Sequence, residues 1–254
     1  MAEDVFERVR AMPVIFDLFP SEPALGSAFA DDANLLPFAT YDVVRTRLQD
    51  AVAKLLLAAR LAQDETQSRY GTHLIVLRPA LVAAAKGIWL VAPNEATERA
   101  GRSCAVVADD RRSGATAMSR ATEKGGPETF KQIGDHFEQA RKKMLTIGDE
   151  FGAVQLPKDT PLINEAAQRV DQYYGSKDAV SDAGLLWNAS SSLAHGERWY
   201  SDLFQGERRR QVADTLTRRS FDVVCSMANL LGQRVLALAV APAAFWQVAV
   251  TDLT

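Results

Sequence analysis

Cysteine and histidine are scarce in this sequence. Its 254 residues include two cysteines and three histidines. The cysteines, Cys104 and Cys225, lie far apart in apolar stretches, which argues against a disulfide framework or a zinc knuckle. A reducing cytoplasm is therefore the expected location, and no cofactor is expected.

Strand patterns are equally hard to find. Alternating β-branched residues are missing and alanine is abundant, so the sequence predicts an all-α protein. Apolar residues at three- and four-residue spacing indicate a bundle of about seven helices. These helices cover about 41–68, 73–91, 95–115, 128–147, 160–175, 181–193 and 211–238, with Asn94 as the N-cap of the third.

Proline is concentrated near the N-terminus, at Pro13, Pro20, Pro23 and Pro37. Because proline interrupts helices, we predict a Pro-rich extended N-terminal arm over residues 1–40. One helical domain is predicted over residues 41–254. The segment Lys124-Gly-Gly-Pro127 gives this domain a possible sub-boundary at 124–127.

No excess of one charge and no long apolar run is present. The formal net charge is −3, so no global basic field exists to attract nucleic acid or anionic lipid. The acidic N-terminal residues are atypical of a signal peptide. The most apolar stretch, residues 235–250, falls short of the ~20 residues that cross a bilayer and contains Pro242, so no membrane span is expected.

The common catalytic motifs are absent as well. No Gly-rich phosphate loop, nucleophile elbow, kinase signature or metalloprotease motif occurs. His73, His136 and His195 lie in three different predicted helices, and such a trio suits a metal in some bundles. No HxxxH or HxxE spacing places two of them on one helical face, so no metal site is predicted.

The segment from Leu186 to Tyr200 is the most unusual in the chain. It reads LWNASSSLAHGERWY, a serine run that leads to His195 and Gly196. Ser191 and His195 are four residues apart, as are Asn188 and Ser192, so at helical spacing asparagine, serine and histidine can share one face, and Gly196 could end the helix. The structural alternative is a helix-end histidine beside a close helix contact.

Two stretches together carry a resemblance. Residues 78–93 contain Arg78-Pro-Ala-Leu and Ala84-Ala-Lys-Gly-Ile-Trp89-Leu-Val-Ala-Pro93, and residues 191–196 read Ser-Ser-Leu-Ala-His-Gly. This pattern resembles a group of uncharacterised bacterial helical proteins with a serine-spaced His-Gly. It is also distantly similar to HEPN-type helical domains, many of which cleave RNA as dimers without metal. Those domains place an Arg four to six residues before the His, whereas here Asn188 and Ser191 precede His195 and Arg198 follows it.

The resemblance implies roles for individual residues. His195 would be the general acid and base, Arg198 would contact phosphate, and Asn188 or Ser192 would orient the scissile group, with an RNA 2′-hydroxyl as nucleophile. Candidate binding residues are two arginines that flank the Trp89 helix and three aromatic residues, of which the last two could stack bases or anchor an interface. These residues are Arg78, Arg102, Trp89, Trp199 and Tyr200.

Three functions follow as expectations. The first is a non-enzymatic, HEPN-like helical interaction protein of the cytoplasm, which the resemblance connects with defence or stress systems. It would bind an unknown protein partner and form a homodimer through the serine- and alanine-rich helix or the apolar C-terminus. The alternative is a metal-independent RNA-cleaving or RNA-binding domain centred on His195. The third is a host- or membrane-associated binding factor that uses the apolar C-terminus and the arm.

Overall fold

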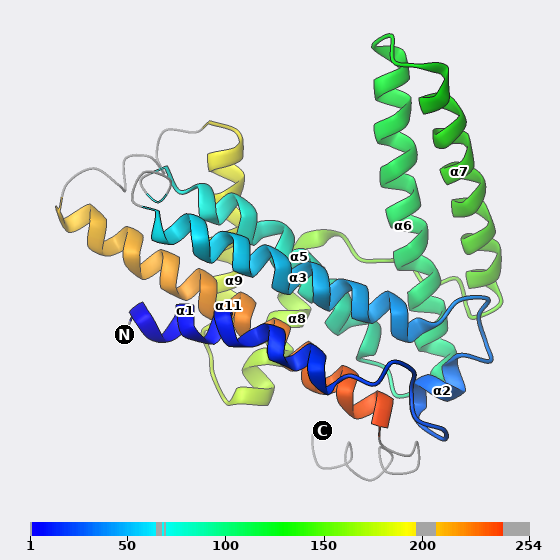
Figure 1. The fold of residues 1–254 in the computed structure, drawn as a ribbon, viewed down its shortest axis with the longest axis horizontal. Coiled ribbons are helices and arrows are strands. Elements are labelled where there is room, and N and C mark those ends of the chain that lie inside the picture. The colour runs from blue at the N-terminus through cyan, green and yellow to red at the C-terminus, as the bar shows by residue number, and fades with distance from the viewer. Residues whose placement is uncertain (1, 65–67, 69, 197–206, 241–254) are drawn as a thin grey trace. The chain divides into compact units, whose positions relative to one another are not determined.

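The chain is helical throughout the part that the structure describes. A computed structural model describes residues 2–64, 68, 70–196 and 207–240 (Figure 1). No strand occurs in these ranges, which confirms the all-α prediction. The α-helices are α1 (Ala2–Ala11), α2 (Ala28–Asp32), α3 (Thr40–Gln63), α5 (Thr72–Val91), α6 (Ala96–Glu123), α7 (Glu128–Asp149), α8 (Asp159–Tyr174), α9 (Ala179–Ala194) and α11 (Glu207–Val240), with one 3-10 helix, η1 (Met12–Leu18).

Each of the seven predicted helices is present, and the described residues contain two more, α1 and α2. Both additional helices fall within residues 1–40, so the expected extended arm is not confirmed there. Pro13 lies at the start of η1, where a missing N–H costs no helical hydrogen bond. Ser27 caps α2 by accepting a hydrogen bond from the backbone N–H of Ala30 (3.3 Å).

The described chain divides into two compact units, each built from separated segments. Unit 1 comprises Met1–Ser21, Val44–Val91 and Lys158–Ala237, and unit 2 comprises Glu22–Val43, Ala92–Pro157 and Leu238–Thr254. Residues 1–40 and residues 41–254 therefore each contribute segments to both units. The expected sub-boundary at 124–127 is the turn between α6 and α7, both of which belong to unit 2.

Unit 1 is organised around α5. This helix is apolar on almost every side, with 13 of its 20 residues buried, and it packs on both α8 and α9, which also pack on each other. Gly87 lets α11 approach closely, because a Cβ at this position would lie 2.3 Å from a methyl carbon of Leu231. A helix that is buried on most sides belongs in the centre of a bundle, which explains why only a narrow stripe of α5, with Arg78 and Lys86, is open to solvent.

Unit 2 contains an antiparallel hairpin of α6 and α7. Small residues set its register: a Cβ at Gly114 would lie 2.8 Å from the Phe137 ring, and one at Gly148 would lie 3.2 Å from the Cβ of Cys104. All eight buried residues of α6 fall within 99–108, and Gly148 is the one buried residue of α7. The hairpin therefore contributes buried residues to a core at its base, whereas towards its tip both helices are largely exposed to solvent.

A buried ion pair holds the base of the hairpin. Arg99 of α6 is 1% exposed and Asp32 of α2 is fully buried. The guanidinium donates two parallel hydrogen bonds to the carboxylate, from Nε to Oδ2 (2.8 Å) and from Nη2 to Oδ1 (2.6 Å). It also donates to the carbonyls of Pro93, Asn94 and Ala28. Burial raises the pKa of Asp32, and the hydrogen bonds from Arg99 oppose that rise.

The residues before α6 differ from the sequence prediction. Glu95, rather than Asn94, is the N-cap of this helix. Asn94 instead turns its carbonyl towards Arg99. The buried Arg99 guanidinium needs hydrogen-bond acceptors, and the Asn94 backbone supplies one of them. This need outweighs the preference of Asn94 for the N-cap position.

Two described helices are long and apolar enough to span a membrane. They are Thr72–Val91 and Gln211–Val240, whose most apolar windows are 72% and 56% buried within the protein. Core helices pass the same test of length and composition, and the absence of a span stays a prediction.

The Asp32–Arg99 pair should dominate the stability of unit 2. We expect Asp32→Asn to lower the free energy of unfolding by about 3 kcal/mol or more, because it leaves a buried cation uncompensated. Arg99→Leu should cost more, since it also removes the donor from three backbone carbonyls. The double variant Asp32→Leu, Arg99→Leu should lose less than the sum of the two single changes.

Urea denaturation of these variants measures this prediction, with Glu98→Gln as the control. Glu98 pairs with Arg102 on the same helix but is 47% exposed, so its loss should change the free energy by less than about 1 kcal/mol. Equal effects of Asp32→Asn and Glu98→Gln would contradict the importance of the buried pair.

Candidate functional site

The residues predicted on α9 divide between its surface and its interior. Asn188 and His195 are both exposed, and His195 forms the C-cap directly before Gly196, whose φ is +71°. Ser192 is 7% exposed and lies on the buried side with Ala189. The expected face of Asn188, Ser192 and His195 is therefore incomplete, because neighbouring elements cover the serine side of the helix.

The other predicted binding residues are distributed through the chain. Trp89 is 5% exposed and belongs to the core, and its role in binding stays a prediction. Arg102 lies in unit 2, where Nη2 donates to Glu98 Oε1 (2.6 Å). Arg198, Trp199 and Tyr200 lie outside the described residues.

Among the described residues, no group of three histidine, cysteine, aspartate or glutamate side chains can hold a metal ion. His73 is fully buried, its Nε2 shares a hydrogen bond with Thr217 Oγ1 (2.9 Å), and burial lowers its pKa to about 4. His136 is exposed on α7. Burial raises the pKa of Cys104 to about 11 and that of Cys225 to about 12, so neither thiol is a ready nucleophile.

An open groove between α3 and α5 gathers basic side chains in unit 1. Its volume is about 300 Å³. It is lined by four cations and one carboxylate around a small apolar floor: Arg47, Asp50, Lys54, Arg78, Pro79, Val82, Ala83 and Lys86. Helical spacing explains the assembly, because both the α3 positions and the α5 positions recur every three or four residues.

One side chain of this groove is held by an aromatic ring from a third helix. The Arg78 guanidinium carbon lies 3.9 Å from the ring centroid of Trp187, on α9. Cation–π stacking of this kind holds the guanidinium plane and leaves its N–H groups at the edge. Arg78, one of the predicted binding residues, therefore lines the α3–α5 groove, and Trp187 is a supporting residue that the sequence did not indicate.

The hairpin presents the second candidate surface. Among the described elements, α7 packs chiefly on α6. A groove of about 690 Å³ follows the outer half of the pair. Its lining is polar and of mixed charge: Ala115, Thr116, Ser119, Arg120, Thr122, Glu123, Lys131, Gly134, Asp135 and Glu138. Beyond this groove, Ile133 and Leu145 of α7 are each 42% exposed.

Sequence reasoning missed several of these residues. The spacing of Arg47 and Lys54 was visible, but nothing local indicates that α5 turns its own cations towards the same groove. Arg99 carries one weak signal, since it is a cation close to the helix N-terminus, where the helix dipole disfavours positive charge. Its partner Asp32 is 67 positions away, which local patterns do not connect.

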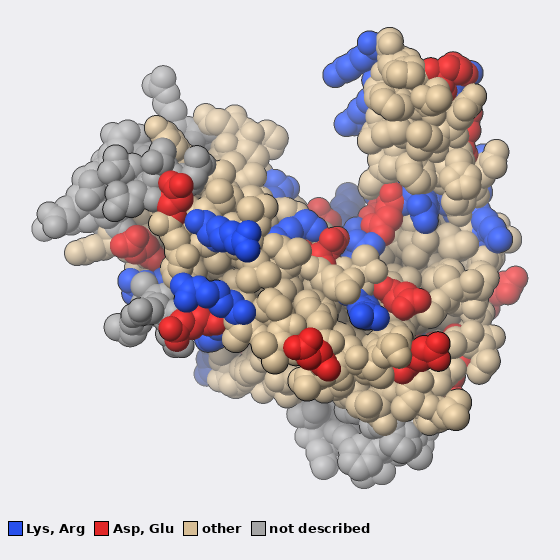
Figure 2. Space-filling model, viewed as in Figure 1, with Lys and Arg blue, Asp and Glu red and all other residues tan. Residues whose placement is uncertain are grey.

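Comparison of the chain with protein-family models, with curated proteins and with solved structures gave no match. The chemistry of these surfaces therefore rests on their own residues. Charges of both signs are interspersed on the face drawn in Figure 2, in keeping with a net charge of −3.

His73 should make stability depend on pH. Its pKa is about 4 in the folded protein, against 6.5 for an ordinary histidine. Above pH 6.5 both states are neutral at this residue and it has no effect. As the pH falls from 6.5 to 4, His73 becomes protonated in the unfolded chain but stays neutral in the folded protein. The free energy of unfolding therefore decreases, by about 2 kcal/mol at pH 5.

Urea unfolding at pH 7.5 and pH 5, for the wild type and His73→Gln, checks this prediction. Glutamine keeps a donor for Thr217 and does not titrate. Carboxylates contribute equally in both proteins, so the loss on acidification should be smaller in the variant. An identical loss would assign the pH dependence to other groups.

Proposed function

We propose that this chain is a non-enzymatic helical interaction protein, and that the α6–α7 hairpin is the surface with which it binds another protein chain. The observation that carries the proposal is the exposure of α7. Only one of its 22 residues is buried, although its sequence has the apolar stripe of a core helix. That stripe comprises Phe130, Ile133, Phe137, Ala140 and Met144.

The packing of the hairpin explains why a partner would stabilise it. Two helices cover only one side of each other, so the apolar stripe of α7 remains partly in contact with water. Four-helix bundles bury such stripes by adding a second pair of helices. A second copy of this chain brings an identical hairpin, and two-fold symmetry is the commonest arrangement of oligomers. The expected homodimer is therefore proposed to form through α7.

This proposal competes with dimerisation through α9, the serine- and alanine-rich helix. The two helices offer a matched pair of residues, since Ile133 on α7 and Leu185 on α9 are both 42% exposed. A glutamate at either position leaves the core untouched. Placed in an interface, it would bury an unpaired charge.

We expect the wild type to be a dimer in solution and Ile133→Glu to raise the dissociation constant at least about tenfold. Leu185→Glu should leave the dimer intact. Light scattering coupled to size-exclusion chromatography, over a range of protein concentrations, measures both. Dissociation by Leu185→Glu alone would move the interface to α9, and a monomeric wild type would overturn self-association.

The second candidate function is metal-independent RNA cleavage at His195. The observation that favours it is the accessibility of the imidazole at the end of α9, on the same side of the helix as Asn188. An accessible histidine is able to exchange a proton with a ribose hydroxyl. This candidate follows the resemblance to HEPN-type domains and their link with defence or stress systems.

If this candidate is correct, the purified protein should cleave single-stranded RNA in EDTA, and His195→Ala should reduce the rate by about 100-fold or more. His136→Ala is the matched control, because it removes another exposed histidine. Cleavage that is unchanged in His195→Ala, or reduced equally in both variants, would refute a catalytic His195. Cleavage by none of the proteins supports the non-enzymatic function.

A further inference from the structure

The α3–α5 groove is built for anions at both of its ends. On α3, Arg47 and Lys54 are seven residues apart, or about 10 Å along the helix axis. On α5, Arg78 and Lys86 are eight residues apart, or about 12 Å. Cations therefore lie two helical turns apart on each wall of the groove.

Between its two cations the α5 wall is uncharged. Pro79, Val82 and Ala83 form this part, and the short side chains of Pro79 and Ala83 leave the hollow open. On the α3 wall, an acidic side chain takes the position between the two cations. Asp50 is the single acidic residue of the lining and pairs with Lys54 (3.2 Å). The balance of the lining is four cations to one carboxylate, in a protein whose net charge is −3.

Arg78 is prepared for a ligand. Its guanidinium stacks on the face of Trp187, with the central carbon 3.9 Å from the ring centroid. Stacking restrains the long side chain before any ligand arrives and leaves the in-plane N–H groups at the edge of the ring. A planar fork of donors at the edge of a groove matches the oxygens of a phosphate.

We propose that the α3–α5 groove binds the phosphate backbone of single-stranded nucleic acid. A free nucleotide carries its phosphates at one end and would use one pair of cations. A strand presents phosphates at intervals and places sugar or base over the apolar part of the α5 wall.

This binding does not depend on either proposed function. It needs no cleavage by His195, which lies on α9, and no dimer through the hairpin of unit 2. The groove and its Trp187 support all belong to unit 1. Failure of one of these proposals therefore leaves the others standing.

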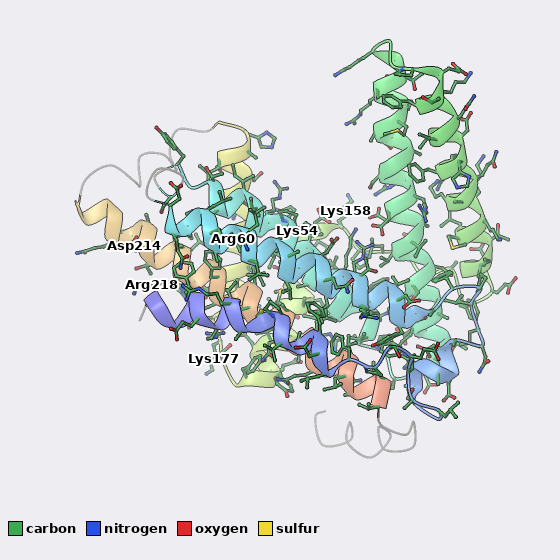
Figure 3. All side chains as sticks on the ribbon, in the orientation of Figure 1. Lys54, Arg60, Lys158, Lys177, Asp214 and Arg218 are labelled. Atoms are coloured by element: carbon green, nitrogen blue, oxygen red, sulfur yellow. The ribbon has the colours of Figure 1, made fainter. Side chains whose placement is uncertain are left out.

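The test is fluorescence anisotropy of a labelled oligouridylate of about ten nucleotides. The full chain is titrated as wild type, Arg78→Gln, Lys54→Gln and Arg60→Gln. Arg60 is the matched control, because it is an exposed cation on the same helix as Lys54 but does not line the groove (Figure 3). Circular dichroism and thermal unfolding verify that each variant is folded.

A plot of log K against log salt concentration should have a slope of about −2 for the wild type. Each neutralised phosphate of a single strand contributes about −0.7, and Asp50 offsets one of the four cations. Arg78→Gln and Lys54→Gln should each weaken binding about two- to fivefold and reduce the slope by about 0.7. Arg60→Gln should bind as the wild type does, and Ile133→Glu should bind equally well.

Three results would each overturn the proposal. The first is no binding of the oligomer at any salt concentration. The second is an equal loss in Arg60→Gln and Arg78→Gln, which would show attraction to surface charge in general. The third is that uridine monophosphate displaces the labelled oligomer at the same concentration as the unlabelled oligomer does. This result would show that the groove binds a free nucleotide.

Discussion

The buried Asp32–Arg99 ion pair is the constraint on which unit 2 depends. Helix α2 has five residues, too few to be stable alone. Two parallel hydrogen bonds fix it against α6, and the same guanidinium binds the chain that leads into α6. Removing two charges from water costs several kcal/mol each, so the pair is favourable only with all its partners in place. One side chain thereby determines how three segments meet.

This arrangement explains the gradient of packing along the hairpin. Near Arg99 the helices meet further elements, and Ala100 and Cys104 join Leu36 in a buried cluster. Further out, α6 and α7 pack chiefly on each other among the described elements, and glycines bring their backbones close without burying either helix. A firm base and an incompletely covered outer half are what an element needs if it is to hold its shape and still bind another chain.

The elements dominated by local periodicity were predictable from sequence, and those set by distant partners were not. The helix over Thr72–Val91 follows from its continuous apolar character, and the two helices within residues 1–40 were hidden by prolines that lie at their margins. Exposure of Asn188 and His195 agrees with their spacing, but burial of Ser192 depends on what covers α9. The groove required knowing that α5 returns along α3, a tertiary fact that neither helix encodes alone.

Net charge is a poor guide to the chemistry of this chain, because its two units distribute charge differently. The hairpin groove mixes both signs, which suits a protein surface, whereas the α3–α5 groove gathers four cations around one carboxylate. Screening limits such fields to about 8 Å at physiological salt, so a local basic groove acts on a ligand regardless of distant acidic residues. Neither surface requires a catalytic group. The accessible imidazole of His195 is therefore compatible with the proposed binding function, in which these cations and apolar side chains would determine the specificity.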